Sequence, residues 1–529
     1  MEPPEEGASR GRRLALSTLF FSVATGLSRV VGLVREIVAA SLFGVTGAMS
    51  AFTIAFQVPN LVRALFADAA LQGAFVPVFT ELLEKGRKKE AFAVASGVFS
   101  LLTMVLGSVT IVFWIAAPAI MPAFAPGLSP GLQDLTVGLS QIMFPIVLLL
   151  ALSGVVVGML NSFEHFSVPS LAPVVWNVII IASLVGLTPV FHGDDRLYAY
   201  AIGVLVGTVV QFALPLPWLR GRGGRFTLNF DWRNPHVLRV LKLMLPVTIA
   251  LGLINFDALI NSIFGTLVSE QAPSAIDKAF RIYMLPQGLF SVAIATILFP
   301  TMARFAARGA FDDLRATMSN GLRQILMLLV PSAVLMAVLA EPITRLVYQR
   351  GAFSAGNTHL VAQAMWVWAL SLPANGVSLL FSRTFFSLQR PWLNTALSVS
   401  NLVVNVAISA ALYGPLGVKG VVLGSVAGTV AMALAQGWYL RRDLSGIEGG
   451  RVLAASLRIG LAAAALAGVS YGVWYGLDQA LGRSLAAQIV SLGLGIAAGI
   501  GVYILGVWVM RLEEARQIAR LLGARFRRT

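Results

Sequence analysis

Long apolar segments separated by short polar or basic loops occur along the whole chain. A helix needs roughly 20 predominantly apolar residues to cross the hydrocarbon core of a bilayer. The pattern therefore predicts an all-α polytopic membrane protein with 14 transmembrane helices. The predicted spans lie near residues 14–41, 50–80, 91–118, 133–160, 168–189, 195–219, 236–268, 275–303, 314–339, 356–387, 391–413, 417–440, 452–477 and 484–510.

The polar and basic stretch 1–13 followed by an apolar run could be a secretory signal peptide. However, the apolar pattern continues past Arg29 to Leu42, without a small-residue cleavage site that leads to a soluble domain. We therefore interpret residues 1–13 as a cytoplasmic N-terminus and residues 14–41 as the first span.

The composition excludes a soluble enzyme and a disordered chain. Of the 529 residues, 57% are apolar and 12% are charged, whereas soluble domains have about 25% charged residues. Cysteine is absent, which excludes disulfides, thiolate metal sites and a cysteine nucleophile. The net charge of +15 could indicate nucleic-acid binding, but basic cytoplasmic loops explain it better, and we expect no nucleic-acid partner.

Basic residues in the loops predict the orientation. With the N-terminus inside, 26 Lys and Arg residues fall in inside loops and tails, and six fall outside. Such an asymmetry is typical of the positive-inside rule. It predicts an even number of spans, with the N-terminus and the basic tail 511–529 both in the cytoplasm.

A weak internal repeat with an offset of about 222 residues relates two parts of the chain. The run Gly207 to Val209 recurs as Gly428 to Val430, and Pro169 matches Pro391. Any single match is trivial, because glycine is common in this chain. A steady offset through a whole segment indicates duplication.

The repeat predicts two lobes of six helices each, residues 14–220 and residues 236–441, joined by a cytoplasmic linker at 221–235. Because six is even, the two lobes are parallel repeats, and transporters of this kind bind substrate between the repeats near the midplane. Spans 13 and 14, residues 452–510, lie outside the repeat.

Charged residues inside predicted spans are the candidate functional residues, because a charge at the centre of a bilayer costs about 2.5–3.5 kcal/mol on insertion scales. Guanidinium groups bind phosphate oxygens bidentately and stay charged when buried, so arginines around one cavity would suit a polyanion. The candidate cations are Arg29, Arg35, Arg63 and Arg281, and the candidate cavity or gating acids are Glu36, Asp68 and Asp257.

Structural alternatives exist for these residues. Arg29 and Arg35 lie about 120° apart on a straight helix, so they share a cavity only if the helix bends, for example at Gly32. Arg35 could instead snorkel or pair locally, and Arg63 could form an ion pair with Asp68.

Enzyme motifs are missing from the sequence. There is no P-loop, and the four histidines are too scattered to predict a metal site. The glycine-rich run Gly493 to Gly499 lies inside span 14, where it indicates close helix packing rather than a dinucleotide loop. We therefore expect a transporter and no enzyme, without a cofactor.

A set of short segments carries a family resemblance. The segments are Ser28 to Glu36, Pro59 to Arg63, Ala74 to Phe79, Leu160 to Asn177 and Arg281 to Pro286. Together they resemble the bacterial lipid II flippases (MurJ/MviN family) of the multidrug/oligosaccharidyl-lipid/polysaccharide (MOP) exporter superfamily.

This resemblance implies a role in peptidoglycan and cell-wall biogenesis, and hence in cell shape, at the bacterial cytoplasmic (inner) membrane. The implied substrate is lipid II, an undecaprenyl-diphosphate that carries a disaccharide-peptide. Its diphosphate would contact Arg29, Arg35, Arg63 and Arg281, while spans 13 and 14 would form a groove for the lipid tail among the membrane lipids. No oligomer is required.

The resemblance also implies coupling to Na⁺ or H⁺, although this chain departs from the pattern of those members. Some members have an Asp where this chain has Asn261, and an Asn/Asp pair where it has Asn401 and Asn405. Asp257 could substitute one turn before Asn261. The expected monovalent cation site is therefore Asp257, Asn261, Asn401 and Asn405. Asp257 could equally be a neutral buried acid or a counter-ion for an arginine.

The predicted mechanism is alternating access, helped by the membrane potential acting on an anionic substrate. Two alternatives stay open within the same fold class. The chain could flip another polyprenyl-diphosphate-linked saccharide, or it could export a small molecule. A membrane enzyme would need clustered acids or a histidine at one membrane face, which the sequence does not show. A scaffold would leave the intramembrane arginines without a purpose.

Overall fold

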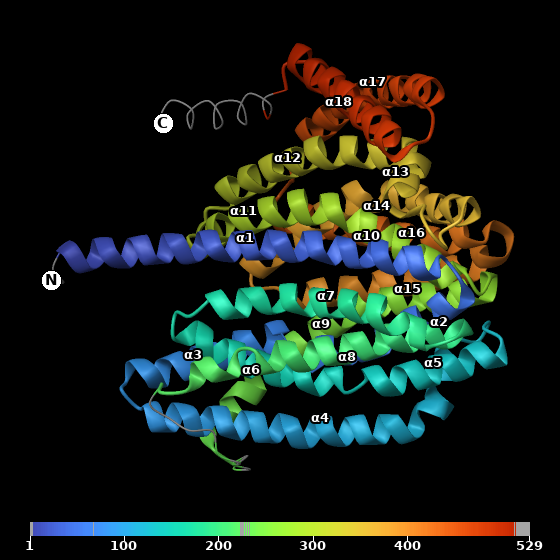
Figure 1. The fold of residues 1–529 in the computed structure, drawn as a ribbon. Coiled ribbons are helices and arrows are strands. Elements are labelled where there is room, and N and C mark those ends of the chain that lie inside the picture. The colour runs from blue at the N-terminus through green and yellow to red at the C-terminus, as the bar shows by residue number, and fades with distance from the viewer. Residues whose placement is uncertain are drawn as a thin grey trace. The chain divides into compact units, whose positions relative to one another are not determined.

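The computed structural model describes the backbone of residues 4–66, 68–222 and 233–512, together with the single residues 227, 229, 231 and 514. Side chains are described for the same residues except 4–19, 21, 22, 64–73 and 245–255. Within these ranges every regular element is a helix (Figure 1). The prediction of an all-α protein is confirmed.

The elements in chain order are α1 (Pro4–Phe43), α2 (Gly47–Phe66), α3 (Asp68–Glu84), α4 (Lys88–Phe124), α5 (Pro130–Met143), α6 (Ile146–Ser162), α7 (Ser167–Leu187), η1 (Thr188–Val190), η2 (Gly193–Arg196), α8 (Leu197–Ala213), η3 (Leu216–Leu219), α9 (Pro235–Val268), α10 (Ala272–Pro286), η4 (Gln287–Ser291), α11 (Val292–Ala307), α12 (Phe311–Val338), α13 (Ala340–Tyr348), α14 (Ala355–Ser387), α15 (Pro391–Leu416), α16 (Val418–Asp443), α17 (Gly449–Leu481) and α18 (Leu485–Val509).

Among the described residues, eleven helical segments are long and apolar enough to cross a membrane. They coincide with the third to sixth and the eighth to fourteenth predicted spans. The first, second and seventh predicted spans fall on α1, on α2 with α3, and on α9. The exact count of fourteen stays a prediction.

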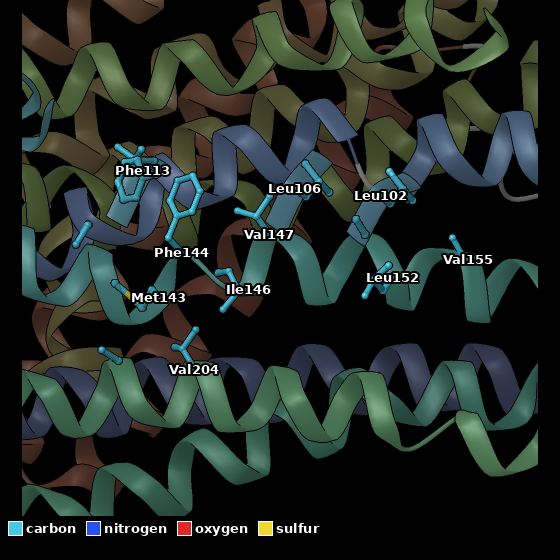
Figure 2. Close-up of a cluster of buried hydrophobic side chains, with 14 of the residues drawn as sticks. Leu102, Leu106, Phe113, Met143, Phe144, Ile146, Val147, Leu152, Val155 and Val204 are labelled. Carbon is cyan, nitrogen blue, oxygen red and sulfur yellow. The ribbon is translucent and has the colours of Figure 1, made fainter. Parts of the chain in front are cut away.

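The chain divides into two compact units, Met1–Thr266 and Leu267–Thr529. The core of the first unit lies around α6, which is apolar on all sides and therefore buried among other helices. Figure 2 shows Val147 of α6 beside Leu106 of α4, and the Phe113 ring stacks on Phe144 with 3.7 Å between ring centroids. Pro145 separates α5 from α6, because its ring cannot continue an undisturbed helix.

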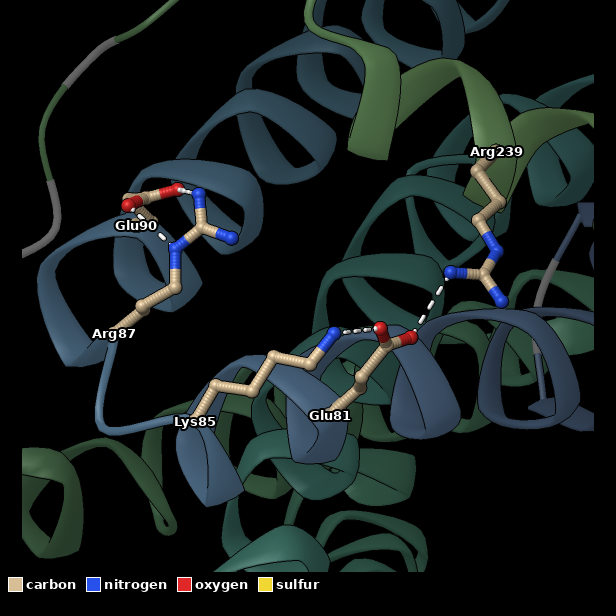
Figure 3. Close-up of polar contacts among 5 residues, drawn as sticks. All are labelled: Glu81, Lys85, Arg87, Glu90 and Arg239. Carbon is tan, nitrogen blue, oxygen red and sulfur yellow. Dashed lines mark hydrogen bonds and ion pairs between the residues drawn. The ribbon is translucent and has the colours of Figure 1, made fainter.

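Helix α9 packs into the first unit at both of its ends. Near its start, Val237 and Val240 are buried in that unit's core. Arg239 Nη1 also lies 2.9 Å from Glu81 Oε2, while Lys85 Nζ lies 2.6 Å from Glu81 Oε1 (Figure 3). At the other end, the backbone N–H of Gly127 donates to Thr266 Oγ1 at 3.2 Å. The repeat places residues 236–268 in the second lobe, whereas packing places most of α9 in the first unit.

Two helix pairs of the second unit pack closely through glycines. On α16, a Cβ at Gly424 would lie 2.0 Å from Ser409 Oγ of α15. On α18, a Cβ at Gly499 would collide with Ser470 of α17, and one at Gly495 would lie 3.0 Å from the Ser470 carbonyl oxygen. The close packing predicted for the Gly493 to Gly499 run is confirmed at Gly495 and Gly499, whereas a Cβ at Gly493 would meet no atom within 4 Å.

Candidate substrate-binding site

Arg35 lies in a closed arrangement between α1 and α7. Its Nη2 is 2.7 Å from Glu36 Oε1, and the two side chains are only 11% and 6% exposed. The guanidinium lies over the Trp176 ring at 4.8 Å from the centroid, and Trp176 Nε1 donates to Thr208 Oγ1 of α8 at 3.0 Å. Arg35 therefore pairs locally with Glu36 and also contacts Trp176 of α7.

Arg29 lies on the same helix but is exposed. Helix α1 is uninterrupted from Pro4 to Phe43 (Figure 1). Gly32 serves the contact with α7, since its Cα faces the Asn177 side chain, which a Cβ would approach to 3.7 Å. The roughly 120° between residues six apart then places Arg29 and Arg35 in different surroundings.

Arg63 lies in the last turn of α2 and is partly buried. Its Nε donates to Asn60 Oδ1 at 2.9 Å, one turn earlier. The side chain of Asp68 lies outside the described residues, so the alternative ion pair with Arg63 stays a prediction.

Arg281 lies on α10 with Asp277 one turn before it. Arg281 Nε is 2.7 Å from Asp277 Oδ2, and the two side chains are 34% and 17% exposed. The buried face of α10 carries Lys278 and Tyr283, which are fully buried. Arg281 is therefore oriented by a pair within its own helix, and about one third of its side chain stays exposed.

The four residues of the expected cation site divide between the two units. In the first unit, Asn261 Nδ2 donates to Asp257 Oδ2 at 3.5 Å. In the second unit, Asn405 is buried between α15 and α16, where it donates to Ser425 Oγ at 3.1 Å and accepts from Ser409 Oγ at 2.9 Å. Asn401 Nδ2 lies 3.7 Å from Met432 Sδ. The amides of the second unit are thus engaged with α16, and the cation site stays a prediction.

The candidate residues are distributed between the two units. The first unit holds Arg29, Arg35, Glu36, Arg63, Asp257 and Asn261, and the second unit holds Arg281, Asn401 and Asn405. Convergence of the arginines on one cavity between the lobes stays a prediction.

Sequence reasoning missed three features of the second unit. Lys278, which lies inside the predicted span 275–303, is fully buried, with Nζ 5.7 Å from the Tyr348 ring centroid. Its position four residues before buried Ile282 was the available signal. The other two are buried ion pairs, Arg345 with Asp478 and Arg323 with Glu514. Their partners are far apart in sequence, so no local signal could have paired them.

The chain is similar to known proteins over most of its length. The family model described as "Lipid II flippase MurJ" matches residues 39–480. A curated relative, the probable lipid II flippase MurJ of Rhizobium meliloti (strain 1021), is 32% identical over 494 residues, which are 91% of this chain and 91% of the relative.

Solved structures share the fold. A lipid II flippase MurJ in an inward closed conformation superposes with a TM-score of 0.77 at 22% identity, over 93% of this chain and 98% of the other. Multidrug resistance MATE family transporters of the MOP superfamily are also similar, each at 16% identity. An inward-facing structure has a TM-score of 0.68 (80% of this chain, 96% of the other). An outward-facing structure has a TM-score of 0.56 (82% and 96%).

Proposed function

Because this chain belongs to the lipid II flippase MurJ family, we propose that it moves lipid II from the inner to the outer leaflet of the bacterial cytoplasmic membrane. Lipid II is undecaprenyl-diphosphate carrying a disaccharide-peptide. The family match over residues 39–480 is the observation that carries this proposal. Both termini would lie in the cytoplasm, in agreement with the excess of basic residues in the predicted inside loops.

The diphosphate would bind to accessible arginines in a central cavity between the lobes. Arg29 is exposed and Arg281 is one-third exposed, although each lies within a predicted span where an unused charge would be costly. Guanidinium forks match phosphate oxygens bidentately. We assign Arg29, Arg63 and Arg281 to the diphosphate, and we assign Arg35 to positioning α1 against α7, because Glu36 and Trp176 enclose it.

The headgroup would cross by alternating access of the two lobes. The likeness in fold to transporters captured in inward-facing and outward-facing states supports this mechanism. The inward-open state would admit the headgroup, and rocking would expose it outside while the lipid tail stays in the bilayer along α17 and α18.

The membrane potential would supply part of the driving force. An inside-negative potential favours outward movement of an anion by about 2.3 kcal/mol per charge per 100 mV, if the charge crosses the full field. Coupling to Na⁺ or H⁺ through Asp257 and Asn261 would add to it. Collapsing the potential with an ionophore should slow translocation in proteoliposomes, and equal flux with and without the potential would contradict this step.

The second candidate is transport of a different cargo by the same fold, either another polyprenyl-diphosphate saccharide or a small molecule. The likeness to MATE transporters keeps this candidate open. An exporter of cationic drugs would need acids rather than arginines in its cavity, so the arginines favour a lipid diphosphate.

The test measures the sidedness of labelled lipid II in proteoliposomes that contain wild-type protein, Arg281→Ala or Arg390→Ala. Arg390 is the matched control, since it pairs with Asp443 and is half exposed outside the spans. We expect fast translocation by wild type and by Arg390→Ala, and a strong loss in Arg281→Ala. If wild type moves another polyprenyl-diphosphate sugar but no lipid II, the substrate assignment is wrong.

A further inference from the structure

The C-terminal helices α17 and α18 lie outside the repeat, yet buried charges join them to the helices before them. At one end, Arg345 of α13 pairs with Asp478 of α17, and the two side chains are 10% and 5% exposed. The Arg345 guanidinium also lies 5.9 Å from the Trp474 ring centroid. Arg483 Nε approaches the same carboxylate at 3.9 Å.

A second buried ion pair lies beyond the other end of the helix pair. Arg323 Nε of α12 is 2.7 Å from Oε1 of Glu514, which follows α18, and the side chains are 13% and 3% exposed. Helix α17 has 33 residues and is therefore about 50 Å long. The two ion pairs thus lie near opposite ends of the helix pair.

Between the two ion pairs, α17 and α18 also contact α12. Tyr503 Oη of α18 donates to the Met327 carbonyl oxygen of α12 at 2.6 Å. Met327 lies in an apolar cluster with Ile459 and Leu466 of α17. Helix α12 therefore contacts the pair along its length.

Buried ion pairs are suited to defining geometry. Their desolvation cost largely offsets their attraction, so they add little stability, but removing one partner leaves a buried charge without compensation. A helix pair held by one such contact could pivot about it. Two contacts at opposite ends, with a hydrogen bond between them, leave a single position.

We infer that α17 and α18 are fastened to α12 and α13 as one rigid body, with Arg323, Arg345, Asp478 and Glu514 as positioning residues. The pair then moves with the second unit during transport and does not act as a separate lid. This inference rests on the proposed function only where it concerns transport, because a lipid tail held along the pair would travel with the second unit.

The first test exchanges the charges of the Arg345–Asp478 ion pair. Arg345→Asp and Asp478→Arg each place like charges together, so we expect the melting temperature in detergent to fall and the folded yield to drop at least threefold. The double exchange should restore at least half of each loss. The matched control is the exposed pair Arg390 and Asp443, where single exchanges should change little. A double exchange as damaging as the sum of the singles would overturn the pairing.

The second test links α13 to α17 covalently. The chain has no cysteine, so Arg345→Cys with Asp478→Cys can be linked specifically by a short bifunctional methanethiosulfonate reagent. We expect linked and reduced protein to translocate lipid II at rates within twofold of each other. Linked protein that is inactive and regains activity on reduction would show that the pair must move, which overturns the inference.

A third readout does not depend on lipid II. Spin labels at Leu481→Cys of α17 and His359→Cys of α14 occupy exposed positions of the second unit. We expect one narrow distance distribution, unchanged when the potential or the pH is varied. Two populations would overturn the rigid body, whereas absent lipid II flux with a constant distance would contradict only the proposed function.

Discussion

Arg345 and Arg281 both lie in the second unit and both pair with an aspartate, but their surroundings differ. The Arg345–Asp478 pair joins α13 to α17 and is 10% and 5% exposed. The Arg281–Asp277 pair lies within α10, one turn apart, and is 34% and 17% exposed. A pair between helices determines how they pack. The pair within α10 orients the Arg281 side chain, of which about one third stays exposed.

Arg35 shows that position in the chain does not separate these two classes. Its acidic partner Glu36 is the next residue, as local as a partner can be, yet the side chain is only 11% exposed because Trp176 of α7 covers it. Enclosure by a second helix therefore distinguishes Arg35 and Arg345 from Arg281, whose side chain is one-third exposed.

The largest expected effect is at the enclosed Arg345–Asp478 ion pair. Arg345→Ala should destabilise the protein by about 3–5 kcal/mol, because it leaves Asp478 buried without its main partner. Chemical unfolding in detergent measures this loss. Adding Asp478→Ala should recover part of the lost stability, because it removes the buried carboxylate that has lost its partner. If Arg345→Ala is as stable as wild type, Arg345 has no structural role and resembles Arg281 instead.

The next effect concerns transport. Arg281→Ala should lower lipid II flux about ten- to a hundredfold, the equivalent of one charged hydrogen-bond interaction, with little change in melting temperature because the side chain is one-third exposed. Flux per folded molecule in proteoliposomes measures it. If melting temperature and flux fall together, Arg281 is structural like Arg345.

A smaller effect tests Arg35. Arg35→Lys keeps the charge but loses the planar stacking on Trp176, so stability should fall by about 1 kcal/mol. Flux per folded molecule should stay within twofold of wild type, by the same proteoliposome assay. A tenfold loss of flux at unchanged stability would mean that Arg35 binds the diphosphate.

The smallest effect is at exposed pairs near helix ends, such as Glu81 with Lys85 and Arg239 (Figure 3). The hydrogen bonds from Lys85 and then Arg239 lower the pKa of the Glu81 carboxyl. Because the folded pKa is the lower one, the stabilisation is present above the unfolded value of about 4.3 and is lost as the pH falls through the folded pKa.

Glu81→Gln should therefore lower the melting temperature slightly at pH 7, and the difference from wild type should vanish at acid pH. The difference should also shrink in high salt, which screens exposed pairs. A large difference that persists at low pH would mean that Glu81 acts through packing.

Much of the fold could be predicted from the sequence, because helix length and apolarity are local properties. The eleven spanning segments of the described chain coincide with predicted spans, and the close packing at Gly495 and Gly499 follows from glycine spacing on one helix face. The different surroundings of Arg29 and Arg35 follow equally from six residues on a straight helix.

Only the tertiary structure decided which charges are enclosed. Asp478 lies 133 residues from Arg345, Trp176 comes to Arg35 from another helix, and α9 packs into the first unit although the repeat assigns it to the second lobe. The hydropathy of a helix records that it has an apolar face, but the cost of a charge on that helix depends on which neighbour covers it, and packing between distant segments sets that neighbour.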